Sequence, residues 1–225
     1  MRTFLVLFTA LFICGCSSLD KIEKEEFIVD LNSVQIHLGE IDLQLDKFMG
    51  GLKRESVNII YFPREDAVCL NFRQDLTTYH QFWNREGREL FLNSLTQYGE
   101  DYAERNLENK KPRTTRQIYG NTEGYLTWRT HRFGMIGKAN MIVGMGYLFK
   151  DRAPYFVIYQ NKTESTEQSA TQNNMECQPI TMYFTRAQAG ELAVFFQQHI
   201  LNDINIQNRL DNLAPATLDI DKEEY

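Results

Sequence analysis

The chain has 225 residues, of which 43% are hydrophobic, with only 13 Gly and 5 Pro, and this composition excludes collagen-like, low-complexity and wholly disordered proteins. The balance of 24 Lys and Arg against 30 Asp and Glu gives a net charge of −6. That charge argues against a general nucleic-acid binder, because neutralising phosphates requires a clustered cationic surface.

The first fifteen residues have the layout of a secretory signal peptide. Arg2 supplies the positive start, and the apolar stretch from Phe4 to Ile13 follows it. This stretch has ten residues, whereas a membrane-spanning helix needs about 20, so we expect no spanning segment. The stretch runs into Ile13-Cys14-Gly15-Cys16, where a small residue should precede the cleavage site.

Ile13-Cys14-Gly15-Cys16 resembles the lipobox of bacterial lipoproteins, in which an aliphatic residue, a small residue and Gly or Ala precede the lipidated Cys. The resemblance implies cleavage after Gly15 and acyl chains, palmitate among them, on Cys16. Because Ser17 and not Asp follows Cys16, it also implies the outer membrane, facing the periplasm or the cell surface. The membrane would then be a partner through the N-terminal lipid.

Removal of residues 1–15 takes away one charged side chain, Arg2, and leaves 23 Lys and Arg against 30 Asp and Glu, a net charge of −7. Residues 16–26 are short and polar and are expected to tether a single domain, residues 27–213, close to the bilayer. The acidic residues 214–225 are expected to form a disordered tail.

The first elements of the domain are predicted to be two β-hairpins and a helix. Hydrophobic residues alternate on both sides of Gly39-Glu40, which predicts a hairpin over residues 34–45. Residues 57–62 and 67–72 are predicted to form a second hairpin around Pro63. A long helix is then expected to begin at Asp75 or Thr77 and to end near Leu107.

Strands dominate the prediction for the remainder of the domain. The candidate strands are residues 114–119, 125–133, 139–149, 155–160 and 180–184, with a mobile loop over residues 162–178. A capping box at Thr185 and Gln188 begins a C-terminal helix. This grouping predicts an α+β fold, an antiparallel β-sheet with one long helix and one C-terminal helix packed on it.

Two cysteines, Cys69 and Cys177, remain in the mature domain besides Cys16. In an oxidising compartment they would form a disulfide if both were accessible. Two buried, unpaired thiols are an equal alternative, because Cys also behaves as a small hydrophobic residue.

Local signatures of known chemistry are absent. The sequence contains no H-E-x-x-H, no paired C-x-x-C and no G-x-S-x-G, and Gly134 to Lys138 is too short for a phosphate-binding loop. Gly144 and Gly146 lie within an apolar strand, where glycines indicate close packing. We therefore predict no cofactor, no metal ion and no catalytic residue, although a site assembled from distant residues remains an alternative.

Residues 110–138 carry seven cations against one carboxylate, Glu123, a local balance of +6 in an acidic chain. These candidate anion-binding residues are Lys110, Lys111, Arg113, Arg116, Arg129, Arg132 and Lys138. Together with the neighbouring aromatic residues they would suit an anionic lipid, a glycan or an acidic envelope protein. The alternative is a solvated sheet face whose cations are paired with the many carboxylates.

The sequence therefore predicts a lipid-anchored protein of the bacterial envelope that is a non-catalytic binding or assembly component. Two alternatives stay open: an envelope hydrolase whose site is assembled from distant residues, and a carrier that holds an apolar ligand between the sheet and a helix.

Overall fold

The computed structural model of the chain describes residues 27–46, 50–130, 135–166 and 175–213. The predicted signal peptide, lipobox, tether and acidic tail lie outside the described residues, as does part of the predicted mobile loop. In chain order the elements are β1 (Ile36–Asp46), β2 (Leu52–Phe62), β3 (Ala67–Gln74), β4 (Thr77–Trp83), α1 (Arg85–Ala103), α2 (Pro112–Thr115), β5 (Gly120–Thr130), β6 (Met135–Lys150), β7 (Ala153–Gln160), β8 (Thr163–Glu164), β9 (Glu176–Cys177), β10 (Ile180–Phe184), α3 (Arg186–Phe196) and α4 (Gln198–Leu213).

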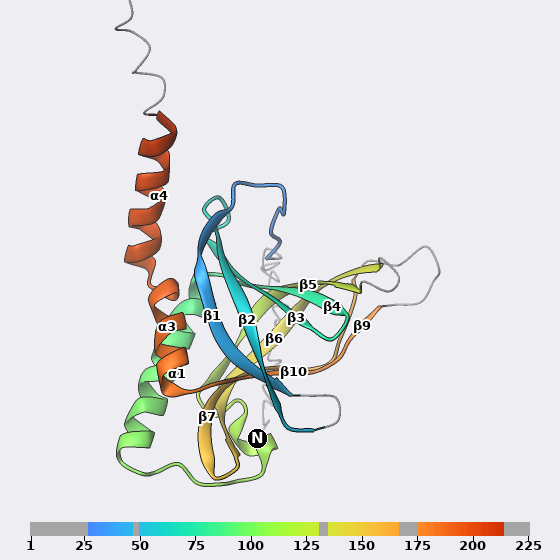
Figure 1. The fold of residues 1–225 in the computed structure, drawn as a ribbon, viewed down its shortest axis with the longest axis vertical. Helices are drawn as coiled ribbons and strands as arrows, with labels where there is room; N and C mark the ends of the chain where they lie inside the picture. The colour runs from blue at the N-terminus through green and yellow to red at the C-terminus, as the bar shows by residue number, and fades with distance from the viewer. Residues whose placement is uncertain (1–26, 47–49, 131–134, 167–174, 214–225) are drawn as a thin grey trace, which may run out of the picture.

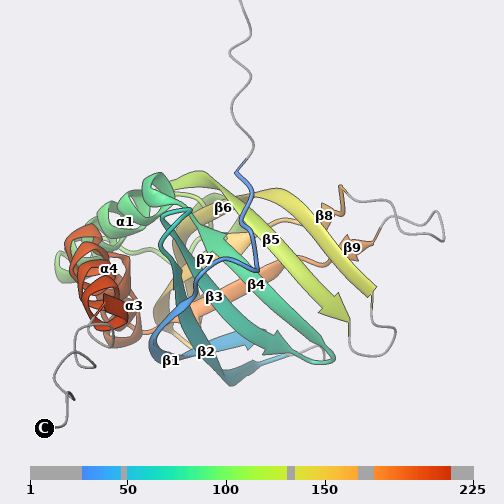
Figure 2. The same cartoon turned by 90° about the horizontal axis from the view of Figure 1, so that it is seen from above.

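Eight of these strands form a closed antiparallel barrel in the order β1-β2-β3-β4-β5-β6-β7-β10, and β10 returns to pair with β1 (Figures 1 and 2). Strands β1 to β7 follow one another around the barrel as they do along the chain. The ladder that closes it places Gln44 opposite Tyr183 and Leu45 opposite Met182. The predicted open α+β sheet is therefore wrong, because the protein is mostly β and its sheet is closed.

Closure has no local signal in the sequence. The alternation of apolar and polar residues shows which face of a strand is buried, and an open sheet covered by helices needs the same alternation as a barrel. Only the pairing of β1 with β10 distinguishes the two folds, and that pairing joins segments from opposite ends of the domain.

Side chains from alternate positions of the strands fill the barrel interior. Its fully buried residues include Leu43, Ile59, Leu70, Trp83, Met145, Phe156 and Phe184. Helices α1 and α3 pack side by side over one end of the barrel and continue this core (Figure 2). Phe91 of α1 meets the rings of Trp83, Phe156 and Phe196 at centroid distances of 6.2, 5.5 and 4.9 Å. None of the described helices is long and apolar enough to cross a membrane.

The first predicted hairpin is a single strand, β1. Gly39 produces a bulge in the pairing with β2 and not a turn, because the register shifts between His37 and Gly39 while the chain continues in one direction. The ring of Phe195 from α3 lies where a Cβ at Gly39 would be, 2.9 Å from its Cζ. The glycine therefore serves helix packing. The second predicted hairpin is confirmed as β2 and β3.

The predicted long helix begins later than expected. Residues 77–83 form β4, and α1 starts at Arg85 after Asn84, whose Oδ1 accepts a hydrogen bond from the Gly87 N–H at 2.8 Å. The spacing of Tyr79 and Phe82 suits a helix, but Thr77 and Thr78 favour a strand and the alternation continues to Trp83.

Two other segments differ from or refine the prediction. The predicted strand at residues 114–119 begins instead as the short helix α2, with Pro112 in its first turn. The predicted C-terminal helix is divided at Gln197 into α3 and α4, and α4 projects beyond the barrel (Figure 1). The capping box of Thr185 and Gln188 is confirmed.

A cluster of polar side chains, which we call the Asp66 node, joins the helices to the barrel. Arg88 of α1 is 1% exposed, and its Nη2 lies 2.9 Å from Oδ1 of Asp66 in the turn between β2 and β3. Arg88 also donates to the backbone oxygens of Asp66 and Trp83, and Gln198 of α4 and Tyr61 donate to Asp66. Burial lowers the pKa of the Arg88 guanidinium, and the Asp66 carboxylate opposes that effect.

Candidate functional site

The structure does not gather the seven predicted cations into one patch. Lys110, Lys111 and Arg113 are exposed in and just after the linker from α1 to α2. Arg129 and Lys138 lie on the outer face of the barrel, and Arg116 packs against β6 and β7. Arg132 lies outside the described residues.

Arg116 serves the packing of α2. Its guanidinium carbon lies 4.3 Å from the centre of the Tyr159 ring. The backbone at Thr115 and Arg116 covers Gly146, where a Cβ would come within 1.8 Å of the Thr115 carbonyl oxygen. The interpretation that Gly144 and Gly146 allow close packing is therefore confirmed, since a Cβ at Gly144 would also meet Gln117 at 2.2 Å.

Lys138 belongs to a line of polar residues on the outer face of the barrel, which we call the polar row, and Arg129 lies beside that row. Five of its residues lie directly opposite one another on successive strands: Asn58, Asn71, His80, Thr127 and Lys138. His37 extends the row at the Asn58 end, where the two side chains form a hydrogen bond. Arg73 lies two strands from Arg129, about 10 Å at the usual strand spacing. Burial lowers the pKa of His80.

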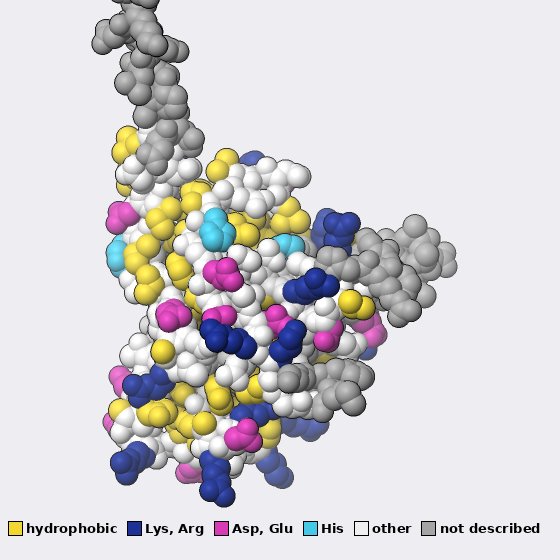
Figure 3. Space-filling view, viewed as in Figure 1, with side chains coloured by type: hydrophobic (Ala, Val, Ile, Leu, Met, Phe, Trp, Pro, Cys, Tyr) yellow, Lys and Arg dark blue, Asp and Glu magenta, His cyan; other side chains and the backbone are white. Residues whose placement is uncertain are grey.

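A second and larger group of cations lies on the segments at the end of the molecule where α1 ends: the turn after α1, the linker and the start of α2, the turn from β6 to β7, and the first residue of α3. We call it the cationic end, and its residues are Arg105, Lys111, Arg113, Arg152 and Arg186. All five side chains are exposed, and none forms an ion pair with another described residue. In Figure 3, Lys and Arg side chains surround an apolar area at the lower end of the molecule, where Figure 1 places the end of α1 and the hairpin of β6 and β7.

Carboxylates are also present near the cationic end, and several of them have other partners. Glu108 pairs with Lys110 at 3.2 Å, and Asp46 pairs with Lys150 at 3.0 Å. Glu104 accepts a hydrogen bond from Asn106. Asp101 accepts a hydrogen bond from the Tyr119 hydroxyl, and none of these carboxylates forms an ion pair with the five cations of the cationic end.

A pocket of about 460 Å³ opens within the cationic end. Its lining consists of Tyr102, Ala103, Arg105, Leu107, Phe149, Pro154 and Arg186, with no carboxylate among them. The guanidinium carbon of Arg186 lies 4.5 Å from the centre of the Tyr102 ring. We call this cavity the end pocket.

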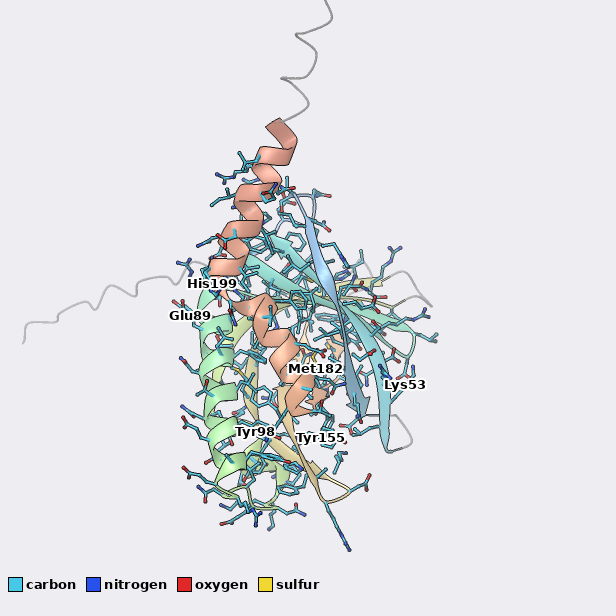
Figure 4. The ribbon with its side chains drawn as sticks, turned by 60° about the vertical axis from the view of Figure 1, so that its left-hand side comes forward. Lys53, Glu89, Tyr98, Tyr155, Met182 and His199 are labelled. Carbon is cyan, nitrogen blue, oxygen red and sulfur yellow. The ribbon has the colours of Figure 1, made fainter. Side chains whose placement is uncertain are left out.

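Neighbouring tyrosines fix the walls of the end pocket. The Tyr98 hydroxyl donates to the Pro154 carbonyl at 3.0 Å and so ties α1 to the start of β7, next to Tyr155 (Figure 4). The Tyr98 ring packs edge-on against Tyr102 at 6.1 Å. Burial raises the pKa of Tyr98, so this hydroxyl remains a hydrogen-bond donor at neutral pH.

A protein-family model described as an uncharacterised Treponema protein matches residues 29–203, which contain the whole barrel and the cationic end. The chain belongs to this family. No curated protein and no solved structure matches it.

Sequence reasoning missed three residues of the cationic end, Arg105, Arg152 and Arg186. Each is a lone arginine in its own stretch of sequence, beside a carboxylate or an uncharged residue, and so has no local charge signal. The fold brings them together because α3 begins beside the place where α1 ends, and the turn from β6 to β7 lies next to both (Figure 1).

The two cysteines of the domain are free and buried, so the possible disulfide between Cys69 and Cys177 is not formed. Cys69 packs among the residues on the outer face of the sheet that Phe27 and Val29 cover, whereas Cys177 belongs to the main core. Burial raises the pKa of the Cys177 thiol to about 12, and the Gln160 side chain donates a hydrogen bond to its sulfur at 3.4 Å.

Within the described residues, no group of three or more His, Cys, Asp and Glu side chains is placed to hold a metal ion. The three histidines in this part of the chain have no carboxylate partner: His37 contacts Asn58, His80 contacts Thr127, and His199 is exposed on α4.

Proposed function

We propose that this protein is a lipid-anchored, non-catalytic binding component of a bacterial envelope, and that its cationic end rests on an anionic membrane surface. The observation that carries the proposal is the cationic end itself, five exposed cations that have no ion-pair partner among the described residues, two of which line an apolar pocket, in a chain of net charge −6. Clustered cations beside exposed aromatic and apolar groups suit the interface of an anionic bilayer.

The sequence of the first sixteen residues supports the anchor. Ile13-Cys14-Gly15-Cys16 provides the lipidation site at Cys16, and Ser17 favours the outer membrane. Two or three acyl chains on one residue hold a protein firmly, at about 0.8 kcal/mol for each buried CH₂ group. The cationic end then has the task of orienting a protein that is already attached.

The length of the tether is sufficient for the cationic end to face the bilayer. Phe27 lies beside Asn84 and Arg85, close to the N-terminal end of α1, and the cationic end lies at the other end of that helix. The helix has 19 residues and is therefore about 28 Å long. The ten residues from 17 to 26 can span at most about 36 Å, so the anchor allows the cationic end to reach the bilayer.

The electrostatic binding energy of the cationic end is large enough to orient the protein on the membrane but too small to attach it. Each Lys or Arg near an anionic leaflet contributes about 1 kcal/mol, so five of them contribute about 5 kcal/mol. That energy alone corresponds to a dissociation constant of the order of 0.2 mM. Such binding is too weak to hold the protein without its lipid, but it is sufficient to select one orientation.

Two observations weigh against the alternative functions. The space between the sheet and α1, where a carrier would hold its ligand, is filled by Trp83, Phe91, Phe156 and Phe196. A hydrolase using a histidine base would pair it with a carboxylate, and the described histidines have none.

Membrane fractionation tests the anchor. The full chain with Cys16→Ala should move from the membrane fraction to the soluble fraction after processing. A Cys16→Ala chain that stays in the membrane with its apolar stretch removed would disprove lipidation at Cys16.

Vesicle binding tests the cationic end. The suitable protein is the mature chain, residues 16–225 with Cys16→Ala, because every helix and strand described lies within it. It should bind phosphatidylglycerol vesicles and not phosphatidylcholine vesicles, and binding should weaken as salt rises. Lys111→Gln with Arg113→Gln should reduce binding, while the matched control, Arg73→Gln with Arg129→Gln on the outer face, should not. The reverse result would place the binding surface on the outer face and overturn the proposal.

A further inference from the structure

The end pocket differs from the remainder of the cationic end because two arginines line it together with aromatic and apolar residues. Arg186 is the first residue of α3, and its guanidinium carbon lies over the Tyr102 ring, 4.5 Å from the ring centre. This cation–π contact favours one position of the guanidinium, whose N–H groups have no hydrogen-bond partner among the described residues. The Thr185 and Gln188 side chains already cap this helix, so the anion-binding capacity of the site rests on the arginines.

Arg105 occupies an unusual backbone position. It has a φ of +61° and follows the end of α1, where its N–H bonds to the Tyr102 carbonyl and the Asn106 N–H bonds to the Asp101 carbonyl. This is a Schellman motif, and its left-handed position is usually glycine. Here an arginine occupies it and lines the pocket. A residue in an unfavourable backbone conformation next to a pocket indicates a role that the fold alone does not require.

The rest of the lining is apolar. Leu107, Phe149, Pro154 and Ala103 line the pocket together with the two arginines, and Tyr102 is 39% exposed. A volume of about 460 Å³ lies within the range of small-molecule sites and exceeds the needs of a bare inorganic anion. The chemistry that fits both halves of the lining is an anionic group joined to a hydrocarbon chain.

We propose that the end pocket binds one phosphate ester that carries an apolar chain, with the phosphate between Arg105 and Arg186 and the chain against Leu107 and Phe149. Planar guanidinium groups donate paired hydrogen bonds to phosphate oxygens as they do to carboxylates, and phosphate is the anionic group that bilayer lipids supply. This inference rests on the proposed function in one respect, since an anionic bilayer is the source of such a ligand. A soluble phosphate ester with an apolar group has the same chemistry.

Calorimetric titration of the mature chain with Cys16→Ala tests the assignment. The probes are dihexanoylphosphatidic acid, dihexanoylphosphatidylcholine and inorganic phosphate. The first should bind, the second should bind at least tenfold more weakly because its headgroup is zwitterionic, and inorganic phosphate should also bind at least tenfold more weakly because it lacks the chain. Inorganic phosphate binding as tightly as the lipid would overturn the proposal.

Matched variants separate the pocket from the surface around it. Arg105→Gln with Arg186→Gln should weaken binding of dihexanoylphosphatidic acid at least tenfold, whereas Lys111→Gln with Arg113→Gln removes the same charge and should change it less than twofold. Equal losses in both variants would reduce the pocket to general charge attraction and contradict the proposal. Leu107→Ser gives a second test, because it should weaken lipid binding without changing the weak binding of inorganic phosphate.

The outcomes for the pocket and for the proposed function are independent. Soluble lipid bound through Arg105 and Arg186, with no binding to phosphatidylglycerol vesicles, would support the pocket and overturn membrane docking. Vesicle binding that depends on Lys111 and Arg113, with no soluble lipid bound, would support docking and overturn the pocket.

Discussion

Arginines lie near both ends of helix α1, but those at one end have opposite surroundings to those at the other. At the N-terminal end, Arg88 is buried and paired with Asp66, which other side chains also contact. At the C-terminal end, Arg105 and Arg186 line an open pocket that has no carboxylate. A cation with partners inside the protein stabilises the fold, whereas an exposed cation with no ion-pair partner among the described residues is available to a ligand.

The largest expected effect on stability comes from removing the charge of Asp66, the partner of Arg88 near the N-terminal end of α1. We call this end the paired end. Asp66→Asn keeps a residue that tolerates the left-handed backbone at this position (φ +46°) but leaves the Arg88 guanidinium buried without its counter-charge. We expect a loss of about 3 kcal/mol in the free energy of unfolding, measured by urea denaturation. The matched control, Asp42→Asn, removes an exposed partner of Arg54 and should leave the unfolding midpoint unchanged. Equal midpoints for both variants would contradict the distinction.

The next effect concerns the segment that carries Lys111 and Arg113. Gly146→Ala places a Cβ against the backbone of α2, so this helix and the linker before it must shift. We expect a loss of about 2 kcal/mol in stability and weaker binding to phosphatidylglycerol vesicles. Gly190→Ala is the control, since nothing lies within 4 Å of its Cβ position in α3. If Gly146→Ala changed neither the stability nor the binding to phosphatidylglycerol vesicles, the packing of α2 would not position the linker.

Cys177 is buried, like Arg88 at the paired end; it belongs to the main core, and its sulfur accepts a hydrogen bond from Gln160. Its pKa rises from 9.0 in the unfolded chain to about 12 in the fold, so above pH 9 the unfolded state binds fewer protons than the folded state. This contribution to stability is complete below pH 9, decreases by about 1 to 2 kcal/mol at pH 10 and is lost by about pH 12. Denaturation midpoints of the wild type and Cys177→Ser should approach one another between pH 9 and pH 10, and parallel curves would disprove the shift.

The smallest effect has the opposite sign. Arg105→Gly relieves a left-handed residue and should increase the free energy of unfolding by about 0.5 kcal/mol, after the cost of the more flexible glycine in the unfolded chain. The same change should weaken lipid binding in the end pocket. Thermal unfolding and calorimetry on one preparation measure both quantities, and a destabilised variant would mean that Arg105 serves the fold as Arg88 does.

Local patterns predicted those parts of the fold that local contacts determine. The hairpin of β2 and β3, strand β10 and the capping box at Thr185 all follow from neighbouring residues. The turn expected at Gly39 failed because its reason is the distant ring of Phe195, and the sequence gives a bulge glycine and a turn glycine the same appearance.

The candidate site was only partly predictable for the same reason. Lys110, Lys111 and Arg113 are adjacent in sequence and produced a visible charge imbalance. Arg105, Arg152 and Arg186 join them only after α1, α3 and the turn between β6 and β7 have met. Arg116 and Arg129 belonged to the same imbalance but were carried to other surfaces by strand direction and by the packing of α2.

The closure of the barrel by its last strand determines when the protein can complete its folding. Gln44 must find Tyr183 across almost the whole domain, and contacts between such distant residues slow folding because a long loop has to close first. Until Ile180–Phe184 are in place, β1 and β7 are exposed sheet edges that can pair with other chains. A chain that ends before Ile180 is therefore an aggregation-prone open sheet, and a chaperone that shields β1 and β7 would oppose that aggregation.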